Sequence, residues 1–250
     1  MEYHGHVGFS VIMPVSKQHL KYVDEAVSSV FNQIYPYWCL WIMDDTGCDA
    51  GIRLQYYQLH EEYNVIASND YLRGKTPKVL GQSKRRNQAI EQINYSFITF
   101  LDADDIYMPD RLELAYNQIK LLPEEKKGKV FLYGDCVYFD HEKEWYWTPQ
   151  TNIKRDDLLK SDCGIPIGSV TVSTELMKKY RFNEKLKIGE DWELYWRLMG
   201  EVEPVYIPQA HYLKRVGSTT CRKFPMSLRR WWVRHHLRKL AEKERYEASA

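Results

Sequence analysis

The hydrophobic pattern of the first half of the chain alternates between two kinds of segment. Short continuous apolar stretches rich in β-branched residues cover residues 9–13, 38–43, 64–67 and 97–101, and each has the length of a buried strand. Between them, apolar residues recur every three or four positions, most clearly over residues 20–34, which is typical of an amphipathic helix. Strands that alternate with helices predict a parallel sheet with helices on both faces.

The remaining helical signals are weaker. One helix is expected over residues 52–62, another carries Ala89, Ile90 and Ile93 on one face, and a third opens at Pro109, where proline is favoured.

From about residue 130 the pattern changes to short strands mixed with loops, aromatic residues and one helix near Asp191. We expect this second half to complete the same sheet. The predicted organisation is one domain in two halves, residues 1–125 and residues 126–221, followed by a basic C-terminal helical extension, residues 222–250.

Acidic residues follow two of the predicted strands: Asp44 and Asp45 in one case, and Asp102, Asp104 and Asp105 in the other. In open α/β sheets, ligands bind outside the carboxyl ends of the strands. Asp102 and Asp104 are two apart, so an extended segment directs both carboxylates to one side, which suits Mg²⁺ or Mn²⁺ arriving with a diphosphate. Alternatively, Asp105 caps the next helix and the other acids form a solvated turn.

Three other positions have two interpretations each. Asp45 either accepts a hydrogen bond from a ring N–H such as that of uracil, or is a turn residue ahead of Thr46 and Gly47. Glu190 and Asp191 begin an apolar-periodic helix, where the helix dipole favours acids, although a carboxylate there also suits a general base for an acceptor hydroxyl.

Six segments appear in the order and at the spacing of glycosyltransferase family 2: FSVIMPV, AVSSVFNQIYPYW, IMDD, RRNQAI, FLDADDIYMPDRL and GEDWELYWRL. The chain resembles this family from about residue 9 to about residue 220. The resemblance implies an α/β GT-A (Rossmann-like) fold with a mixed, mainly parallel central sheet flanked by helices. One departure is DDTG where the family usually has DDGS, which leaves the turn after Asp45 uncertain.

The resemblance also implies a role for individual residues. Asp191 matches the general base, which implies inversion at the anomeric carbon. Asp104 matches the metal ligand, with Asp102 as a second ligand nearer the ribose. The remaining residues implied in donor binding are Pro14, Val15, Asp45, Arg86 and Ala103. Residues implied in the acceptor site or in a loop that closes on the diphosphate are Glu190, Trp192 and Arg215.

The composition of the chain limits its expected partners and cellular compartment. The net charge is +1, so no overall field favours nucleic acid as a partner. The five cysteines are scattered and odd in number, which argues against a disulfide framework and a zinc site and favours a reducing compartment. No signal peptide or membrane-spanning stretch is evident, so we expect a protein that is cytoplasmic or peripheral at the cytoplasmic face of a membrane.

The basic C-terminal stretch has an apolar stripe of Val233, Leu237 and Leu240 beside Trp231 or Trp232. Such a helix either lies on an anionic membrane or packs on its own domain or on a second subunit as a homodimer. Protein packing is slightly favoured because the stripe is narrow.

The sequence therefore predicts an inverting, metal-dependent glycosyltransferase. It would move a sugar from a nucleotide diphosphate sugar, most simply a UDP-sugar, to a hydroxyl of a glycan or glycoconjugate acceptor in polysaccharide or glycoconjugate biosynthesis. A nucleotidyltransferase is disfavoured because no Gly-rich, basic loop follows the first strand. A non-catalytic nucleotide-sugar or carbohydrate-binding module is the alternative from another class.

Overall fold

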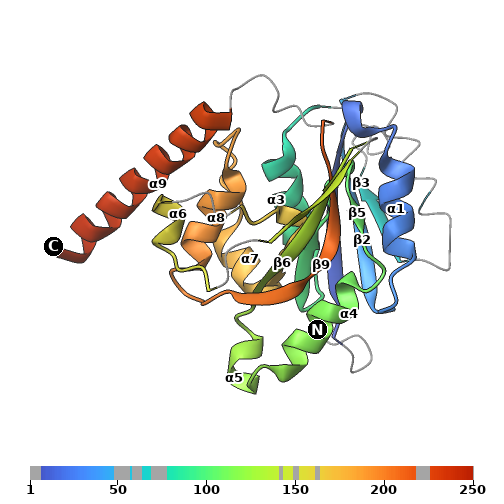
Figure 1. Cartoon of the computed structure of the whole chain (residues 1–250), viewed down its shortest axis with the longest axis horizontal. Helices are drawn as coiled ribbons and strands as arrows, with labels where there is room; N and C mark the ends of the chain where they lie inside the picture. The colour runs from blue at the N-terminus through green and yellow to red at the C-terminus, as the bar shows by residue number, and fades with distance from the viewer. Residues whose placement is uncertain are drawn as a thin grey trace.

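The computed structural model describes residues 7–47, 57, 64–68, 78–140, 143–148, 152–160, 164–217 and 226–249. The chain forms a three-layer α/β domain in which one twisted sheet is covered by helices on both faces (Figure 1). The strands are β1 Phe9–Ser16, β2 Trp38–Asp45, β3 Val65–Ser68, β4 Phe97–Phe100, β5 Ile106–Tyr107, β6 Phe131–Phe139, β7 Glu144–Trp147, β8 Thr171–Ser173 and β9 Val205–Arg215.

The sheet order is β3-β2-β1-β4-β8-β6-β9-β5, with β7 paired to β6 outside this path. The pairs among β3, β2, β1 and β4 are all parallel, whereas β8 joins β4 and β6 in antiparallel fashion and β9 runs parallel to β6. The sheet is therefore mixed, and its two halves are continuous through β4 and β8. A single α/β domain is confirmed, while the boundaries at residues 125 and 221 stay a prediction.

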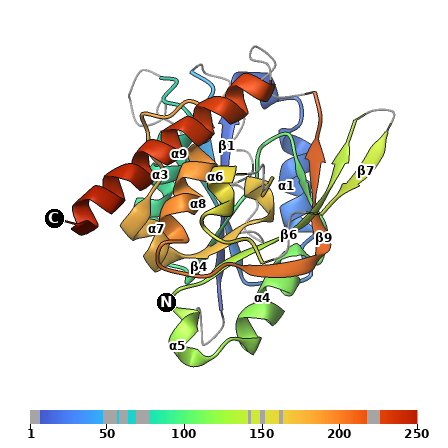
Figure 2. The same ribbon diagram turned by 60° about the vertical axis from the view of Figure 1, so that its left-hand side comes forward.

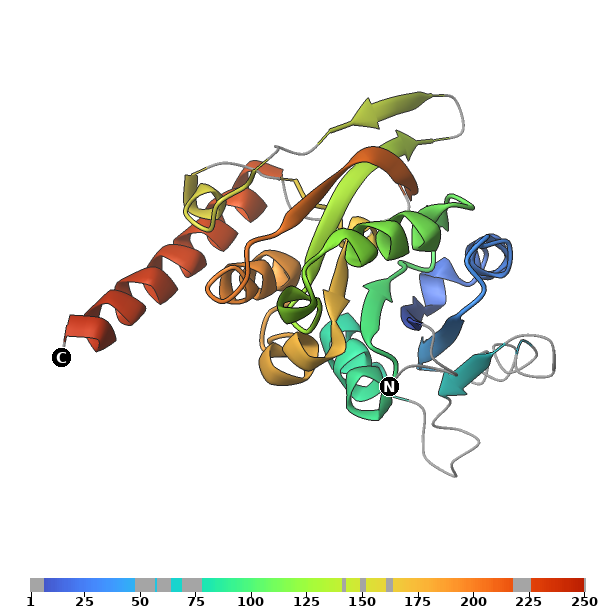
Figure 3. The same ribbon diagram turned by 90° about the horizontal axis from the view of Figure 1, so that it is seen from below.

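Two groups of helices cover the sheet. α1 Val23–Phe31 and α4 Arg111–Leu121 pack on one face, and α3 Gln82–Gln92, α7 Thr174–Tyr180 and α8 Glu190–Leu198 pack on the other, as Figures 1 and 3 show. The short elements are η1 Lys17–His19, α5 Glu124–Lys127, α6 Asp157–Lys160 and η3 Ile167–Ser169, and the chain's C-terminal helix is α9 Met226–Ser249.

The predicted strands are all present, but one expectation about β2 was wrong. This strand does not stop before Asp44 and Asp45. It runs through both, because Val15 and Ser16 of β1 continue the parallel pairing opposite them. The acids therefore belong to the strand and are held rigidly at its carboxyl end.

Two predicted helices begin and end elsewhere. The helix expected over residues 20–34 is reduced to α1, which is preceded by a 3₁₀ helix at residues 17–19. The helix expected from Pro109 begins at Arg111, with Asp110 at its N-cap position. The predicted helix over residues 52–62 lies outside the described residues, apart from Tyr57.

The apolar stripe of α9 belongs to the core. Val233, Leu237 and Ala241 are buried with α6 and α8, and Leu240 packs beside them. The preference for packing of this stripe on protein is therefore confirmed, and the partner is the chain's own domain. No helix in the described part of the chain is long and apolar enough to cross a membrane.

Candidate active site

The carboxyl ends of β1 and β2 place a buried aspartate against the start of α3. Asp45 accepts hydrogen bonds from the backbone N–H groups of Leu80 (2.7 Å) and Gly81 (3.1 and 3.2 Å). The Nε of Arg85 lies 3.3 Å from the same carboxylate. Pro14 and Val15, expected at the nucleotide pocket, pair with Met43 and Asp44 on the adjoining strand. Asp45 thus anchors the N-terminus of α3 to the sheet edge.

The turn after Asp45 is stabilised by Asp44. Its Oδ1 accepts hydrogen bonds from the backbone N–H (2.8 Å) and the hydroxyl (2.7 Å) of Thr46. Gly47 then adopts a φ of +66°, a conformation that glycine adopts without strain. The DDTG departure from the family pattern therefore forms a well-bonded turn.

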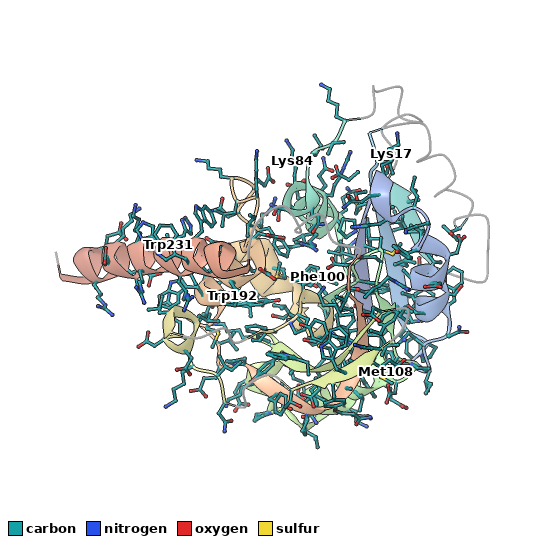
Figure 4. All side chains as sticks on the ribbon, turned by 45° about the horizontal axis from the view of Figure 1, so that its top comes forward. Lys17, Lys84, Phe100, Met108, Trp192 and Trp231 are labelled. Atoms are coloured by element: carbon teal, nitrogen blue, oxygen red, sulfur yellow. The ribbon has the colours of Figure 1, made fainter. Side chains whose placement is uncertain are left out.

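Arg86 joins the two acidic segments of the site. Its Nη2 donates to Oδ1 of Asp102 at 2.8 Å, and its Nη1 lies 3.5 Å from Oε1 of Glu190. The guanidinium is almost completely buried (1% exposed) and lies over the rings of Phe100 and Phe182. Figure 4 shows Phe100 in the interior of the molecule. The structure therefore places Arg86 between the Asp102 segment and α8, whereas the neighbouring Arg85 contacts Asp45.

The segment after β4 concentrates negative charge and brings cations to it from other elements. The Nζ of Lys214, on β9, lies 3.7 Å from Asp102 and 3.3 Å from Asp105. The Nε2 of His19 lies 3.8 Å from Asp104. Burial opposes ionisation of Asp102, but Arg86 and Lys214 more than offset it and hold its pKa below the usual value. Asp102 is therefore kept ionised.

Asp105 has a different role from that of its neighbours. It accepts hydrogen bonds from the backbone N–H of Arg215 (2.7 Å) and from the hydroxyl of Tyr212. Burial, reinforced by Asp102 and Asp104 and opposed by Lys214, raises the pKa of Asp105 to about 7. Asp105 does not cap a helix, because the short strand β5 follows it. Through its hydrogen bonds to Tyr212 and Arg215, Asp105 instead connects the acidic turn to β9.

Arg215 lies behind this turn. Its Nε donates to the carbonyl oxygen of Asp104 at 2.9 Å, and its guanidinium also pairs with Glu25 of α1. The side chain is buried over the rings of Tyr22 and Phe139. Arg215 thus stabilises the Asp102–Asp105 turn. The predicted closing loop covers residues 215–224, of which residues 218–224 lie outside the described residues.

The N-terminus of α8 carries the candidate base. Asp191 is half-buried, and its Oδ1 accepts the backbone N–H of Trp192 at 2.9 Å. Burial and the adjacent Glu190 carboxylate raise the pKa of Asp191 to about 6. The ring of Trp192, expected at the acceptor site, packs in the core (Figure 4), so Glu190 and Asp191 are the residues of this trio that stay partly exposed.

A divalent cation fits this site when the phosphates of a bound substrate supply part of its coordination. Among the described residues, no group of three or more His, Cys, Asp or Glu side chains could hold a metal ion. Asp102 and Asp104 nevertheless offer the carboxylate oxygens that Mg²⁺ and Mn²⁺ prefer, and Mg²⁺ commonly takes only one or two protein carboxylates beside substrate phosphates. The donor set therefore suits a metal whose coordination is completed by a diphosphate.

Two residues of the site were not singled out from the sequence: His19 and Lys214. Lys214 adjoins Arg215, and Arg85 adjoins Arg86, but the family resemblance assigned a role only to Arg215 and Arg86. Which member faces the site depends on helix rotation and strand register, and the sequence pattern does not specify either at single-residue precision.

Comparison with known proteins identifies the family. The family model "Glycosyl transferase family 2" matches residues 10–181. The chain belongs to this family. It is therefore a transferase enzyme, and the predicted resemblance is confirmed.

One curated relative covers most of this glycosyltransferase, and another covers less than half of it. The chain is 27% identical over 232 residues to the Escherichia coli UDP-Glc:alpha-D-GlcNAc-diphosphoundecaprenol beta-1,3-glucosyltransferase WfgD, covering 90% of this chain and 84% of that protein. It is 34% identical over 106 residues to the putative teichuronic acid biosynthesis glycosyltransferase TuaG of Bacillus subtilis, covering 42% of this chain and 38% of that protein.

Solved structures share the fold. S. aureus TarS 1-349 in complex with UDP-GlcNAc superposes with a TM-score of 0.65 at 21% identity, over 84% of this chain and 58% of that one. The Pyrobaculum calidifontis mannosyltransferase PcManGT, in complex with GDP-Man and Mn²⁺, gives a TM-score of 0.56 at 14% identity, over 82% of this chain and 56% of that one. This chain therefore spans less than two thirds of either structure.

The buried bridge made by Arg86 predicts a large effect on stability. We expect Arg86→Met to lower the free energy of unfolding by about 2–4 kcal/mol, because Asp102 and Glu190 lose their shared counter-charge in a poorly solvated place. Urea unfolding measures this. Arg181→Met is the matched control, since its ion pair with Glu91 is largely exposed, and should cost less than about 1 kcal/mol.

A double variant separates lost charge balance from lost packing. Arg86→Met combined with Asp102→Asn should cost less than the sum of the two single changes, because the amide needs no counter-charge. Additive losses would show that Arg86 does not act through Asp102.

Proposed function

We propose that this glycosyltransferase transfers a sugar, with inversion, from a nucleoside diphosphate sugar to a hydroxyl group of a glycan or glycoconjugate acceptor. The observation that carries the proposal is the Arg86 bridge, which draws Asp102 of the acidic turn and Glu190, the neighbour of Asp191, onto one guanidinium. A donor-binding acid and a candidate base are thereby held in one site.

UDP is the nucleotide we favour. The name of the E. coli relative specifies a UDP-Glc donor and a lipid diphosphate-linked acceptor, and TarS is solved with UDP and with UDP-GlcNAc. In this proposal Asp45, at the carboxyl end of β2, also accepts a hydrogen bond from the base, in addition to its bonds to the start of α3. Assembly of a cell-surface polysaccharide, the setting named for TuaG as teichuronic acid biosynthesis, is the context these relatives support.

Side chains of this protein can carry out the main steps of sugar transfer. Asp191 accepts the proton of the acceptor hydroxyl as its oxygen forms a bond to the anomeric carbon. The bond from that carbon to the diphosphate oxygen breaks on the opposite face, and its electron pair leaves with the nucleoside diphosphate. Asp102 and Asp104 would hold a divalent cation that, when bound, stabilises the negative charge of the departing diphosphate.

Replacement of the base separates donor binding from transfer. Asp191→Asn should keep the affinity for UDP, since the amide preserves the size of the side chain, and should lose about 10²–10⁴-fold in transfer rate. Calorimetric titration with UDP and a coupled assay for released nucleoside diphosphate measure the two properties. Turnover at the wild-type rate would refute the assignment of Asp191.

The raised pKa of Asp191 predicts the acid limb of the pH profile. Only the ionised carboxylate accepts a proton, so kcat/KM should fall as the pH drops through about 6. Glu190→Gln removes a negative charge that raises this pKa, and the limb should therefore move to lower pH. Initial rates across the acid and neutral range test this, and an unmoved limb in Glu190→Gln would assign it to another group.

Metal dependence is tested at Asp104 with a set of donors. UDP-, dTDP- and GDP-sugars, each with Mn²⁺ or with EDTA, are compared by slow hydrolysis and by thermal shift. We expect a Mn²⁺-dependent response to UDP-sugars that Asp104→Asn abolishes, because the variant lacks one of the two carboxylates. Equal affinity for the donor with and without Mn²⁺ in the wild type would contradict a metal-dependent mechanism.

A further inference from the structure

The inner face of α9 packs against the rest of its own domain. Val233, Leu237 and Ala241 recur at four-residue intervals and are buried in the core. Near the far end of the helix, Glu244 pairs with Arg155 at 2.8 Å. Any contact of α9 with another surface must therefore use the opposite face, which Figures 1 and 2 show along the outside of the molecule.

That outer face combines exposed tryptophan with cations. Trp231 is 59% exposed and Trp232 is 41% exposed, although both are large apolar side chains. Each stacks on the histidine four residues later, Trp231 on His235 and Trp232 on His236, so the indole rings are held in fixed orientations. Figure 4 shows Trp231 on α9.

The cations lie on the same side as Trp231. At 100° per residue, Arg234, His235 and Arg238 fall within one broad face with Trp231, away from Val233 and Leu237. These four residues line a shallow surface pocket. We call Trp231, Trp232, Arg234, His235, Arg238 and Lys239 the outer face of α9.

The charge of this segment is of one sign. Residues 226–241 contain no acidic residue and five cationic ones: Arg229, Arg230, Arg234, Arg238 and Lys239. A face that carries two exposed tryptophans with Arg234, Arg238 and Lys239 is complementary to a surface of phosphate groups, because cations pair with the phosphates while indole rings settle at the boundary between polar and apolar layers. A second copy of the chain is disfavoured, since a two-fold interface would set this basic face against itself.

The same helix touches the candidate base segment. A Cβ atom added to Gly189 would lie 2.2 Å from the Cγ2 atom of Val233, so the backbone at Gly189 packs directly on α9. Gly189 is the N-cap of α8 and immediately precedes Glu190 and Asp191. Trp231 and Trp232 precede Val233 on α9, within one helical turn of this contact.

We propose that the outer face of α9 docks on an anionic phospholipid surface and holds the Asp191 end of α8 beside it. A lipid-linked acceptor would then present its hydroxyl group at the level of the site. The acceptor part of this inference rests on the proposed function; docking on the lipid surface does not.

The test uses the whole chain without substrate, so its result is independent of catalysis. Co-sedimentation is measured with vesicles of phosphatidylcholine alone and of phosphatidylcholine mixed with phosphatidylglycerol. We expect binding to the mixed vesicles that weakens with salt. Arg234→Gln/Arg238→Gln should weaken it about 30-fold, the effect of two cations near an anionic surface.

A matched control removes the same charge elsewhere. Lys120→Gln/Lys126→Gln changes two exposed lysines on α4 and α5, and should alter vesicle binding by less than about twofold if the α9 face is specific. Trp231→Ser should also weaken binding, with a wild-type melting temperature because the ring is exposed. UDP-sugar hydrolysis should be unchanged in the three variants.

Several outcomes would overturn the proposal. These are absence of binding to the mixed vesicles, equal loss of binding in the Lys120/Lys126 control, and concentration-dependent dimerisation that Arg234→Gln/Arg238→Gln abolishes. Vesicle binding in a protein that hydrolyses no nucleotide sugar would instead retain the docking surface and refute the proposed function.

Discussion

The arrangement of the site depends on one buried cation. The guanidinium of Arg86 lies between two aromatic rings and contacts Asp102 and Glu190, which are far apart in the sequence. Burying an unpaired cation is strongly unfavourable, so the two carboxylates compensate for it as much as it compensates for them. The separation between the acidic turn after β4 and the N-terminus of α8 is thereby set by the width of a guanidinium group.

The start of α3 extends this organisation to the nucleotide side. Arg85 and Arg86 are consecutive, and side chains of consecutive helical residues point about 100° apart. Arg85 accordingly reaches Asp45 at the end of β2, while Arg86 reaches Asp102. Through these two arginines, one turn of α3 contacts all three acidic segments of the site, at Asp45, Asp102 and Glu190. A rotation of α3 would therefore disturb all of these contacts together.

The sequence predicted the parts of this site that local patterns encode. Buried strands are recognisable as apolar stretches, and the acids that follow them mark the ligand edge of the sheet, so Asp45, Asp102 and Asp104 could be proposed as site residues. A local cap was the alternative interpretation of Asp105, because a helix was expected next, but its partners, Tyr212 and Arg215, lie more than a hundred residues away. Such pairing depends on the register of β9, which no local periodicity reports.

The C-terminal helix shows how one sequence pattern can support two different structures. The stripe of Val233 and Leu237 is compatible with a lipid interface and with a protein core, because both are apolar, and its narrowness only slightly favours the core. Its burial against α6 and α8 decides in favour of the core, and this result changes the meaning of the remaining residues. The two tryptophans beside the stripe are exposed on the opposite face of the helix, together with Arg238 and Lys239. A contact between this face and a surface would therefore act on α8 through Val233 and Gly189, without any rearrangement of the core.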